Sequence, residues 1–204
     1  MKRLERSLIY NGYAGQLMMF DDYPSGSPSH LDNPYAFKIY AIEHAINSGY
    51  KILLHLDASF WAIKNPATIF DIINEKGVFA FRTGYNMAQT SSDKALQWAG
   101  ITRDEAELLP EYASGAVGLN LDNPNGKKVY ELWKEGMEFG LFINSREYNS
   151  NDSSDYRFLH ARQDQTVWSL AIHKCGLNMD YQDYISYYGT GRNEDKCIFL
   201  IGGI

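Results

Sequence analysis

The chain has 204 residues, of which 45% are hydrophobic, 14% aromatic and 22% charged, a composition that excludes a disordered chain and favours one globular domain over residues 1–204. The net charge of −6 argues against a protein that binds a nucleic-acid backbone, because phosphate contacts need clustered Lys and Arg. The N-terminal residues are too polar for a signal peptide or a membrane span, so a cytoplasmic protein without a membrane span is expected.

The first segments alternate between helical and apolar patterns. Leu4 and Leu8 stand four residues apart in Arg3 to Tyr10, which predicts a short amphipathic helix. The apolar run Gln16 to Phe20 predicts a buried strand. The following stretch, Asp21 to Asn33, is rich in Pro, Gly, Ser and Asp and therefore predicts a loop.

A helix and a strand are then expected in close succession. Pro34 opens the helix with Asn33 as its N-cap, and Ser48-Gly49 ends it. Lys51 to Leu56 (KILLHL) is a nearly continuous apolar run, which is typical of a central parallel strand covered on both faces. Asp57 follows this strand directly.

The same alternation continues to the end of the chain. Helices are expected over 67–75, 102–109, 126–139 and 163–175, and strands over 78–82, 114–121 and 197–201. This order predicts an α/β fold with an open, mostly parallel sheet and helices on both faces. Ligands of such sheets bind beyond the carboxyl ends of the strands, which is where Asp57 stands.

Three segments together resemble one family. Leu53 to Ser59 (LLHLDAS), Ser114 to Asn120 (SGAVGLN) and His160 to Gln165 (HARQDQ) resemble the hhhhDxD segment, the glycine-containing acceptor-side strand and the later Asp-Gln segment of GT-A nucleotide-sugar glycosyltransferases. They occur in the family's order and, with the intervening elements, cover most of residues 35 to 180. The resemblance implies a GT-A-like fold, a nucleotide-sugar donor and an acceptor that it does not identify.

The sequence departs from the GT-A pattern at its start. GT-A domains generally open with a strand, whereas this chain begins with a predicted helix. Either the chain is truncated, or another segment fills the place of that strand. The apolar run Cys197 to Ile201 is the candidate for that place.

The resemblance also assigns a donor site. In the GT-A pattern the first Asp handles the nucleotide and the last Asp holds a divalent metal that bridges the phosphates; these positions are Asp57 and Ser59 here. A serine hydroxyl replaces a metal-binding carboxylate poorly. Either Asp57 alone ligates Mg²⁺ or Mn²⁺ with waters and phosphate oxygens, or Lys38 and Arg82 neutralise the diphosphate without metal.

Four further residues complete the expected site. By the resemblance, Asp164 lies near the transferred sugar as a base or as a stabilising charge, and Gln165 hydrogen-bonds sugar hydroxyls. Ser114 and Gly115 form the part of the acceptor-side strand at which substrate approaches the backbone. Each candidate also has a structural interpretation: Asp57 caps a turn, Asp164 stabilises a helix N-terminus, and Lys38 reaches solvent along its helix. His160 either binds phosphate or metal or is a structural hydrogen-bonder.

Two other functions stay open. A catalytically inactive GT-A-like binding or scaffold protein would explain Ser59 and the absent first strand. A nucleotidyltransferase of related architecture would need a glycine-rich, basic loop that this sequence lacks. The sequence contains no GxSxG, no phosphate-binding P-loop and no GxGxxG after a strand, so nothing supports a hydrolase, a P-loop kinase or a dinucleotide oxidoreductase.

Overall fold

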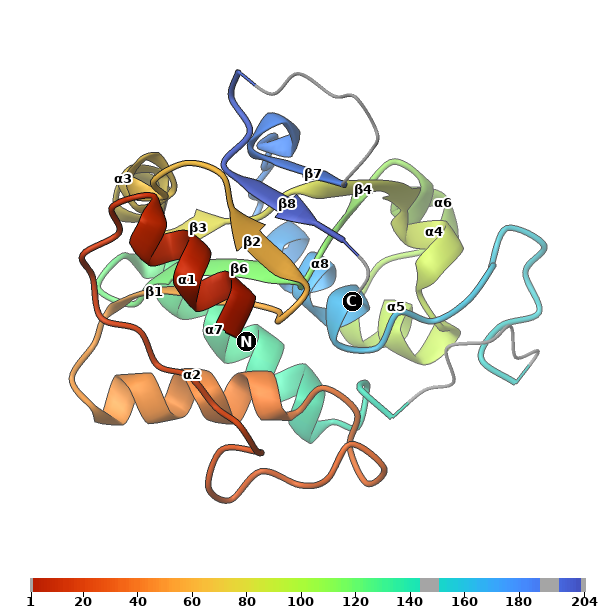
Figure 1. Ribbon diagram of the computed structural model, residues 1–204. Helices are drawn as coiled ribbons and strands as arrows, with labels where there is room; N and C mark the ends of the chain where they lie inside the picture. Colours follow the sequence, from red (N-terminus) through yellow and green to blue (C-terminus); the bar gives the residue numbers. More distant parts are fainter. Residues whose placement is uncertain (1, 144–150, 188–194, 203–204) are drawn as a thin grey trace.

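A computed structural model describes residues 2–143, 151–187 and 195–202. The described chain is a mixed α/β fold that carries three small sheets (Figure 1). The first sheet has the strand order β1-β6-β3, from Ile52–Leu56, Ala116–Asn120 and Val78–Phe79. The second has the order β2-β8-β7, from Phe60–Ala62, Phe199–Ile201 and Ile185–Tyr187. The third pairs β4 (Arg82–Asn86) with β5 (Pro110–Tyr112).

The α/β class is confirmed, but these sheets are mostly antiparallel and not mostly parallel as expected. In the first sheet β6 runs antiparallel to both neighbours, and in the described residues only β7 and β8 pair in parallel. Strands β1 and β3 do point the same way, but β6 lies between them. Gly118 permits this position, because a Cβ there would lie 2.6 Å from side-chain atoms of Ile73 and Phe79.

The expected helices are present, and two further helices, α4 and α5, were not expected. Their bounds are α1 Lys2–Tyr10, α2 Phe37–Asn47, α3 Ala67–Lys76, α4 Met87–Thr90, α5 Asp93–Ala99, α6 Arg103–Glu107, α7 Pro124–Glu138 and α8 Asp164–Lys174, with a 3-10 turn η1 at Gln182–Tyr184. The Thr102/Glu105 capping box is present at the start of α6. Helix α2 begins at Phe37 and not at Pro34, because Tyr35 has a φ of 63°, which a right-handed helix cannot contain.

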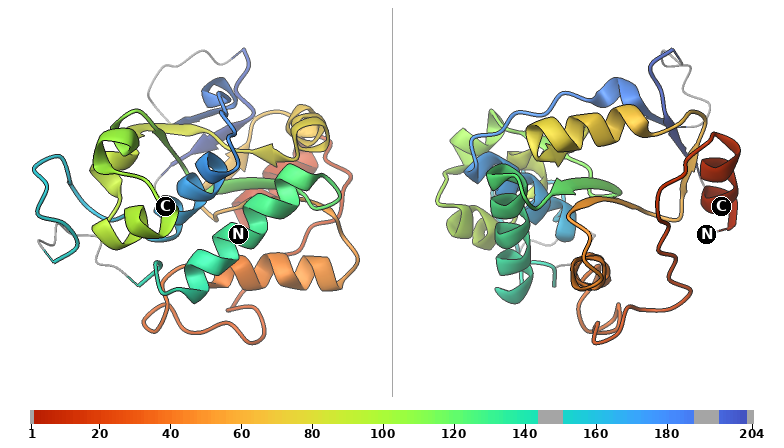
Figure 2. Two further views of the ribbon diagram at one scale, coloured as in Figure 1. Left: turned by 180° about the vertical axis from the view of Figure 1, so that it is seen from behind. Right: turned by 90° about the vertical axis from the view of Figure 1, so that its left-hand side faces the viewer.

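The β1-β6-β3 sheet separates two apolar cores. Val117 and Leu119 on one face of β6 pack with α7, α8 and α2, whereas Ala116 on the other face packs with α3, β8 and α1. Helices α3 and α7 accordingly lie on opposite sides of this sheet (Figure 2). No helix in the described residues is long and apolar enough to span a membrane.

Three expectations about the strands are wrong. Gln16 to Phe20 has no regular secondary structure and joins no sheet. Strand β1 is not covered on both faces, since it lies at the edge of its sheet and Ile52 is 41% exposed. The C-terminal run does not take the place beside β1 either, because its strand, Phe199–Ile201, lies between β2 and β7.

The edge position leaves backbone groups of β1 unpaired. In the ladder with β6, the Leu121 N–H donates to the Lys51 carbonyl and the Asp57 N–H donates to the Gly115 carbonyl. The backbone N–H and C=O groups of the odd-numbered residues of β1 therefore point toward β6. The N–H and C=O groups of Ile52, Leu54 and Leu56 therefore point the other way. None of the described residues hydrogen-bonds to them.

Candidate functional site

The antiparallel pairing of β1 with β6 brings Asp57 to the segment that precedes β6. Asp57 directly follows β1, and its N–H donates to the Gly115 carbonyl at 2.8 Å. Its own carbonyl accepts from Phe60 N–H at 3.1 Å, which turns the chain into β2. The carboxyl end of β1 and the start of β6 therefore form one corner, and Asp57, Ser114 and Gly115 lie in it together.

Lys38 reaches this corner from the first turn of α2. Its side chain is 2% exposed, and Nζ lies 3.3 Å from Asp57 Oδ1 and 3.0 Å from Asp164 Oδ2. The ammonium also donates to the carbonyl and the hydroxyl of Ser114, at 3.1 and 3.3 Å. One buried cation thus joins three chain segments that are far apart in sequence.

The charges in this cluster hold one another ionised. Burial acts to lower the pKa of Lys38, but the charges of Asp164 and Asp57 outweigh it and the pKa is raised. Burial likewise acts to raise the pKa of Asp57, but the Lys38 charge and a contact from His55 Nε2 at 3.3 Å outweigh it, so the pKa is lowered. Lys38 is therefore an ammonium and Asp57 a carboxylate at neutral pH.

The start of α8 supplies Asp164 and Gln165. Both side chains are buried, and the Gln165 amide oxygen accepts from the Ser114 N–H at 3.4 Å. The indole of Trp133 donates to the Asp164 carbonyl at 2.9 Å, which fixes the first turn of the helix. The preceding residue, Gln163, has φ 51° and ψ −120°, a conformation that a non-glycine residue holds only under strain.

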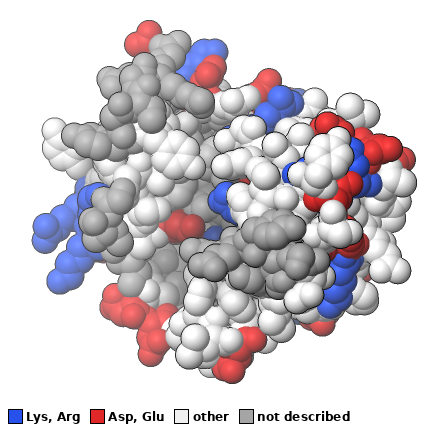
Figure 3. Space-filling model, turned by 90° about the vertical axis from the view of Figure 1, so that its right-hand side faces the viewer, with Lys and Arg blue, Asp and Glu red and all other residues white. Residues whose placement is uncertain are grey.

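Lys38, its two carboxylate partners, Ser114 and Gln165 line one polar cavity of about 410 Å³. Its wall also includes Tyr35, and among the described residues Tyr35 and Gln163 are the two non-glycine residues with positive φ. Strained backbone gathers at functional sites because packing there must force a specific geometry. The face of the molecule seen in Figure 3 is hollowed, and acidic and basic atoms lie next to one another inside the hollow.

Two buried polar atoms in the wall have hydrogen-bonding capacity left over. Asp164 Oδ2 has the Lys38 ammonium nearby but no aligned hydrogen bond, and the Gln165 amide nitrogen has no hydrogen-bond partner. The exposed fractions of these residues are 3% and 7%. A buried polar group without a partner is destabilising, so such groups in a cavity wall indicate a polar ligand.

The structure brings together seven of the eight residues expected from the sequence. Lys38, Asp57 and Ser59 line the polar cavity with the segments Ser114–Gly115 and Asp164–Gln165.

Arg82 is the eighth residue, and it does not line this cavity. It is the first residue of β4, and its guanidinium donates to Asn178 Oδ1 at 2.9 Å. The chain leaves the first sheet after β3, which separates Arg82 from the corner that Asp57 occupies.

Sequence reasoning missed two residues of the site. His55 contacts Asp57 because residues two apart in a strand project from the same face. Arg162 lines the polar cavity within the HARQDQ segment, and its guanidinium forms no ion pair with a carboxylate of the described residues. The period of the strand could have indicated His55, whereas nothing in the sequence indicates which way Arg162 points.

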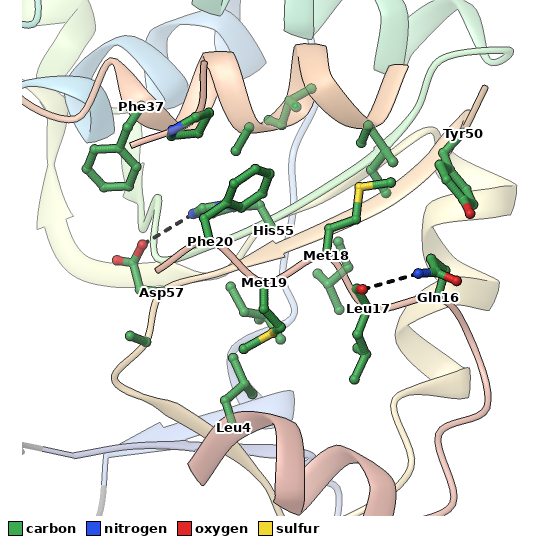
Figure 4. Close-up of a pocket in the computed structure, with 18 of the residues that line it drawn as sticks. Leu4, Gln16, Leu17, Met18, Met19, Phe20, Phe37, Tyr50, His55 and Asp57 are labelled. Atoms are coloured by element: carbon green, nitrogen blue, oxygen red, sulfur yellow. Dashed lines mark hydrogen bonds and ion pairs between the residues drawn. The ribbon is translucent and has the colours of Figure 1, made fainter. Parts of the chain in front are cut away.

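A second, apolar cavity of about 770 Å³ adjoins the polar one. It lies between β1, α1, α2 and the segment Gln16 to Phe20, whose Met18 and Phe20 side chains enter it (Figure 4). Asp57 and Tyr35 line both cavities. The smaller cavity is the candidate site, because the buried charges and the unsatisfied groups of Asp164 and Gln165 line it and not the larger one.

A divalent cation does not fit the acidic residues of the polar cavity well. Asp57 Oδ1 already lies beside Lys38 and His55, and Ser59 stands where a second carboxylate would be expected. Among the described residues, no three His, Cys, Asp or Glu side chains are placed to hold a metal ion together.

Comparison with known proteins gives little guidance. No family model matches the chain, and no curated protein matches it. The apo crystal structure of mouse xyloside xylosyltransferase 1 is similar to it with a TM-score of 0.48 and 14% sequence identity, over 89% of this chain and 67% of that chain. A similarity at this level defines neither the fold nor the activity.

Proposed function

We propose that this protein is a glycosyltransferase that moves a sugar from a nucleoside-diphosphate donor to an acceptor hydroxyl. The observation that carries the proposal is a pair of buried groups on α8 in the wall of the polar cavity, Asp164 Oδ2, which has only the ion pair with Lys38, and Gln165 Nε2, which has no hydrogen-bond partner. One can only accept a hydrogen bond and the other can only donate. A sugar hydroxyl does both, so a polyhydroxylated ligand satisfies the pair.

The sequence resemblance supplies the reaction. The bond between the anomeric carbon and the β-phosphate oxygen breaks, and its electron pair stays on the phosphate. The acceptor oxygen forms a new bond to the same carbon and loses its proton. The products are a glycoside and a nucleoside diphosphate, and the site must stabilise the charge that grows on the leaving phosphate.

The proposed roles follow from the geometry. Asp57 and Ser59 bind the nucleotide part of the donor, and Asp164 and Gln165 bind the sugar. A Cβ at Gly115 would lie 3.2 Å from Asp57 Oδ2 and 3.0 Å from the Phe60 ring, so glycine leaves Asp57 in position and leaves room beside it. Lys38 contacts both Asp57 and Asp164 and therefore fixes the distance between the nucleotide end and the sugar end of the cavity.

Calorimetric titration with UDP-glucose, UDP-N-acetylglucosamine and GDP-mannose tests the proposal, with NAD as a control dinucleotide. We expect one of the sugar nucleotides to bind with a stoichiometry of one and NAD not to bind. Release of UDP or GDP in the presence of acceptor extracts then tests transfer. A protein that binds none of the sugar nucleotides is not a glycosyltransferase of this kind, and one that binds without release is the inactive binding protein.

A further inference from the structure

The place between Asp57 and Asp164 is already filled by a cation. The Lys38 ammonium lies 3.3 Å from one carboxylate and 3.0 Å from the other. Mg²⁺ and Mn²⁺ need several oxygen ligands around one point, and here Ser59 replaces a carboxylate while Lys38 occupies the centre. A divalent ion would have to displace Lys38 or bind next to a fixed positive charge, and both are unfavourable.

Lys38 is not free to move away or to serve a ligand. It is 2% exposed, its N–H groups face the two oxygens of Ser114 and the Asp57 carboxylate, and its charge is paired with Asp164 at 3.0 Å. An ammonium has three N–H donors, so the Ser114 and Asp57 acceptors use its capacity. Lys38 is therefore a positioning residue that holds the carboxylates, and the charge on a diphosphate must be met by another group.

Among the described residues, Arg162 is the other cation in the wall of the polar cavity. Its guanidinium has no carboxylate partner among these residues, and it lines the cavity together with His160. Burial and the Arg162 charge lower the pKa of His160, so the imidazole is neutral at neutral pH and adds no charge of its own. A planar guanidinium can donate two parallel hydrogen bonds to phosphate oxygens, which a lysine cannot.

We propose that the donor diphosphate is bound without a divalent cation, with Arg162 as the group that meets its charge and Lys38 in the place of the metal. This inference rests on the proposed glycosyltransferase function. It assigns the leaving-group charge to a residue of the chain, so binding and transfer proceed in the presence of a chelator. It also makes Asp57 a binding residue for the nucleotide and not a metal ligand.

Sugar-nucleotide binding is measured by calorimetry in EDTA and again with added Mn²⁺, using the donor that binds best. We expect dissociation constants that agree within about twofold. Binding of Mn²⁺ without a nucleotide is measured from the electron paramagnetic resonance signal of the free ion. We expect the wild type to bind no more Mn²⁺ than the Asp57→Asn variant. Binding that needs Mn²⁺ would overturn the inference and leave the glycosyltransferase function standing, whereas no binding in either buffer would overturn the function itself.

Arg162 is tested by Arg162→Gln in EDTA, with Arg6→Gln as the matched control, since Arg6 is exposed on α1 and lines neither cavity. Loss of a charge-assisted contact should weaken donor binding about tenfold or more, and Arg162→Lys should recover part of it. The midpoint of thermal unfolding shows whether each variant is folded. A folded Arg162→Gln variant that binds donor as tightly as Arg6→Gln would refute the role of Arg162.

Discussion

The two cavities meet at Asp57 and Tyr35, yet they are built in opposite ways. The polar cavity is lined by charged and amide side chains that are tied to one another across α2, β1, β6 and α8, and of these Lys38, Asp164 and Gln165 are almost fully buried. The apolar cavity is lined mainly by apolar side chains, many of them half-buried, and by one unpaired edge of β1. From this difference we infer that the buried charges, and not the volume of a cavity, hold the side chains in place.

The physical reason lies in what each group loses when it moves. A buried charge that leaves its partner is destabilised by several kcal/mol, so each member of the Lys38 cluster holds the others in place. A half-buried apolar side chain gives up only part of its contact area when it shifts, and that area is replaced easily. We therefore expect substitutions in the polar cavity to act strongly and those in the apolar cavity to act weakly.

Removing the central charge should have the largest effect. Lys38→Met keeps the apolar stem but leaves Asp57 and Asp164 facing each other without a cation. Breaking a buried pair costs about 3–5 kcal/mol, and the lower end is expected because Asp57 is 35% exposed. Urea unfolding measures this loss, with Lys51→Met, an exposed lysine just before β1, as the control.

The double variant Lys38→Met/Asp164→Asn separates charge from packing. If the loss is electrostatic, neutralising one carboxylate restores part of the free energy of unfolding. A double variant that is no more stable than Lys38→Met would show instead that the lysine stem, and not its charge, supports the site.

The second-largest effect is expected on the rate of sugar transfer. Asp164→Asn keeps the size of the side chain and leaves Lys38 paired with Asp57 and Ser114, so the fold should persist. Loss of the carboxylate near the sugar should lower the rate of nucleoside diphosphate release about 100-fold, a larger factor than the weakening of donor binding caused by the lost contact with the sugar. Asp122→Asn, in the exposed turn before α7, is the control. Equal rates in the two variants would place the reacting carbon away from Asp164.

The pH dependence of stability follows from the same cluster. The pKa of Asp57 is lowered from 3.8 in the folded protein. Its contribution to the free energy of unfolding is therefore complete above pH 3.8 and is lost as the pH falls through the lower folded-state pKa. The pKa of Lys38 is raised from 10.5, so its contribution is complete below that value and is lost as the pH rises through the higher folded-state pKa.

The difference in the free energy of unfolding between wild type and Lys38→Met should therefore be constant from about pH 5 to about pH 9 and shrink on either side. Urea titrations across this range measure the difference directly. A difference that stays the same at low pH would mean that the ion pair with Asp57 contributes nothing to stability.

The contrast between the cavities also explains what the sequence could and could not predict. Local signals are reliable: the helix expected over 67–75 is α3, which ends at the Gly77 C-cap with φ 83°, and the helix expected over 102–109 contains α6, which begins at the Thr102/Glu105 capping box. The corner residue Asp57 was found because a buried strand that ends in Asp is a local pattern as well.

Features set by distant contacts were not predictable. Strand β6 packs Gly118 closely against Ile73 and Phe79, which are far from it in sequence, and α2 begins late because Tyr35 has a positive φ. Arg82 and Arg162 are both arginines near predicted site segments, and only the tertiary fold decides that the second lines the cavity and the first bonds Asn178.

The smallest effect is expected in the apolar cavity, and it has the opposite sign. Ala41 lies on α2 and lines this cavity but not the polar one, so Ala41→Leu adds three carbons to unfilled space without disturbing a charge. Full burial would stabilise by about 0.8 kcal/mol per carbon, and a gain of about 1 kcal/mol is expected because the cavity is partly open. Ala67→Leu, exposed at the start of α3, controls for helix propensity and should give no gain. A destabilised Ala41→Leu variant would mean that α2 packs directly on β1 and that no room exists there, whereas a stabilised variant with unchanged donor binding shows that the two cavities, although they share Asp57, act independently.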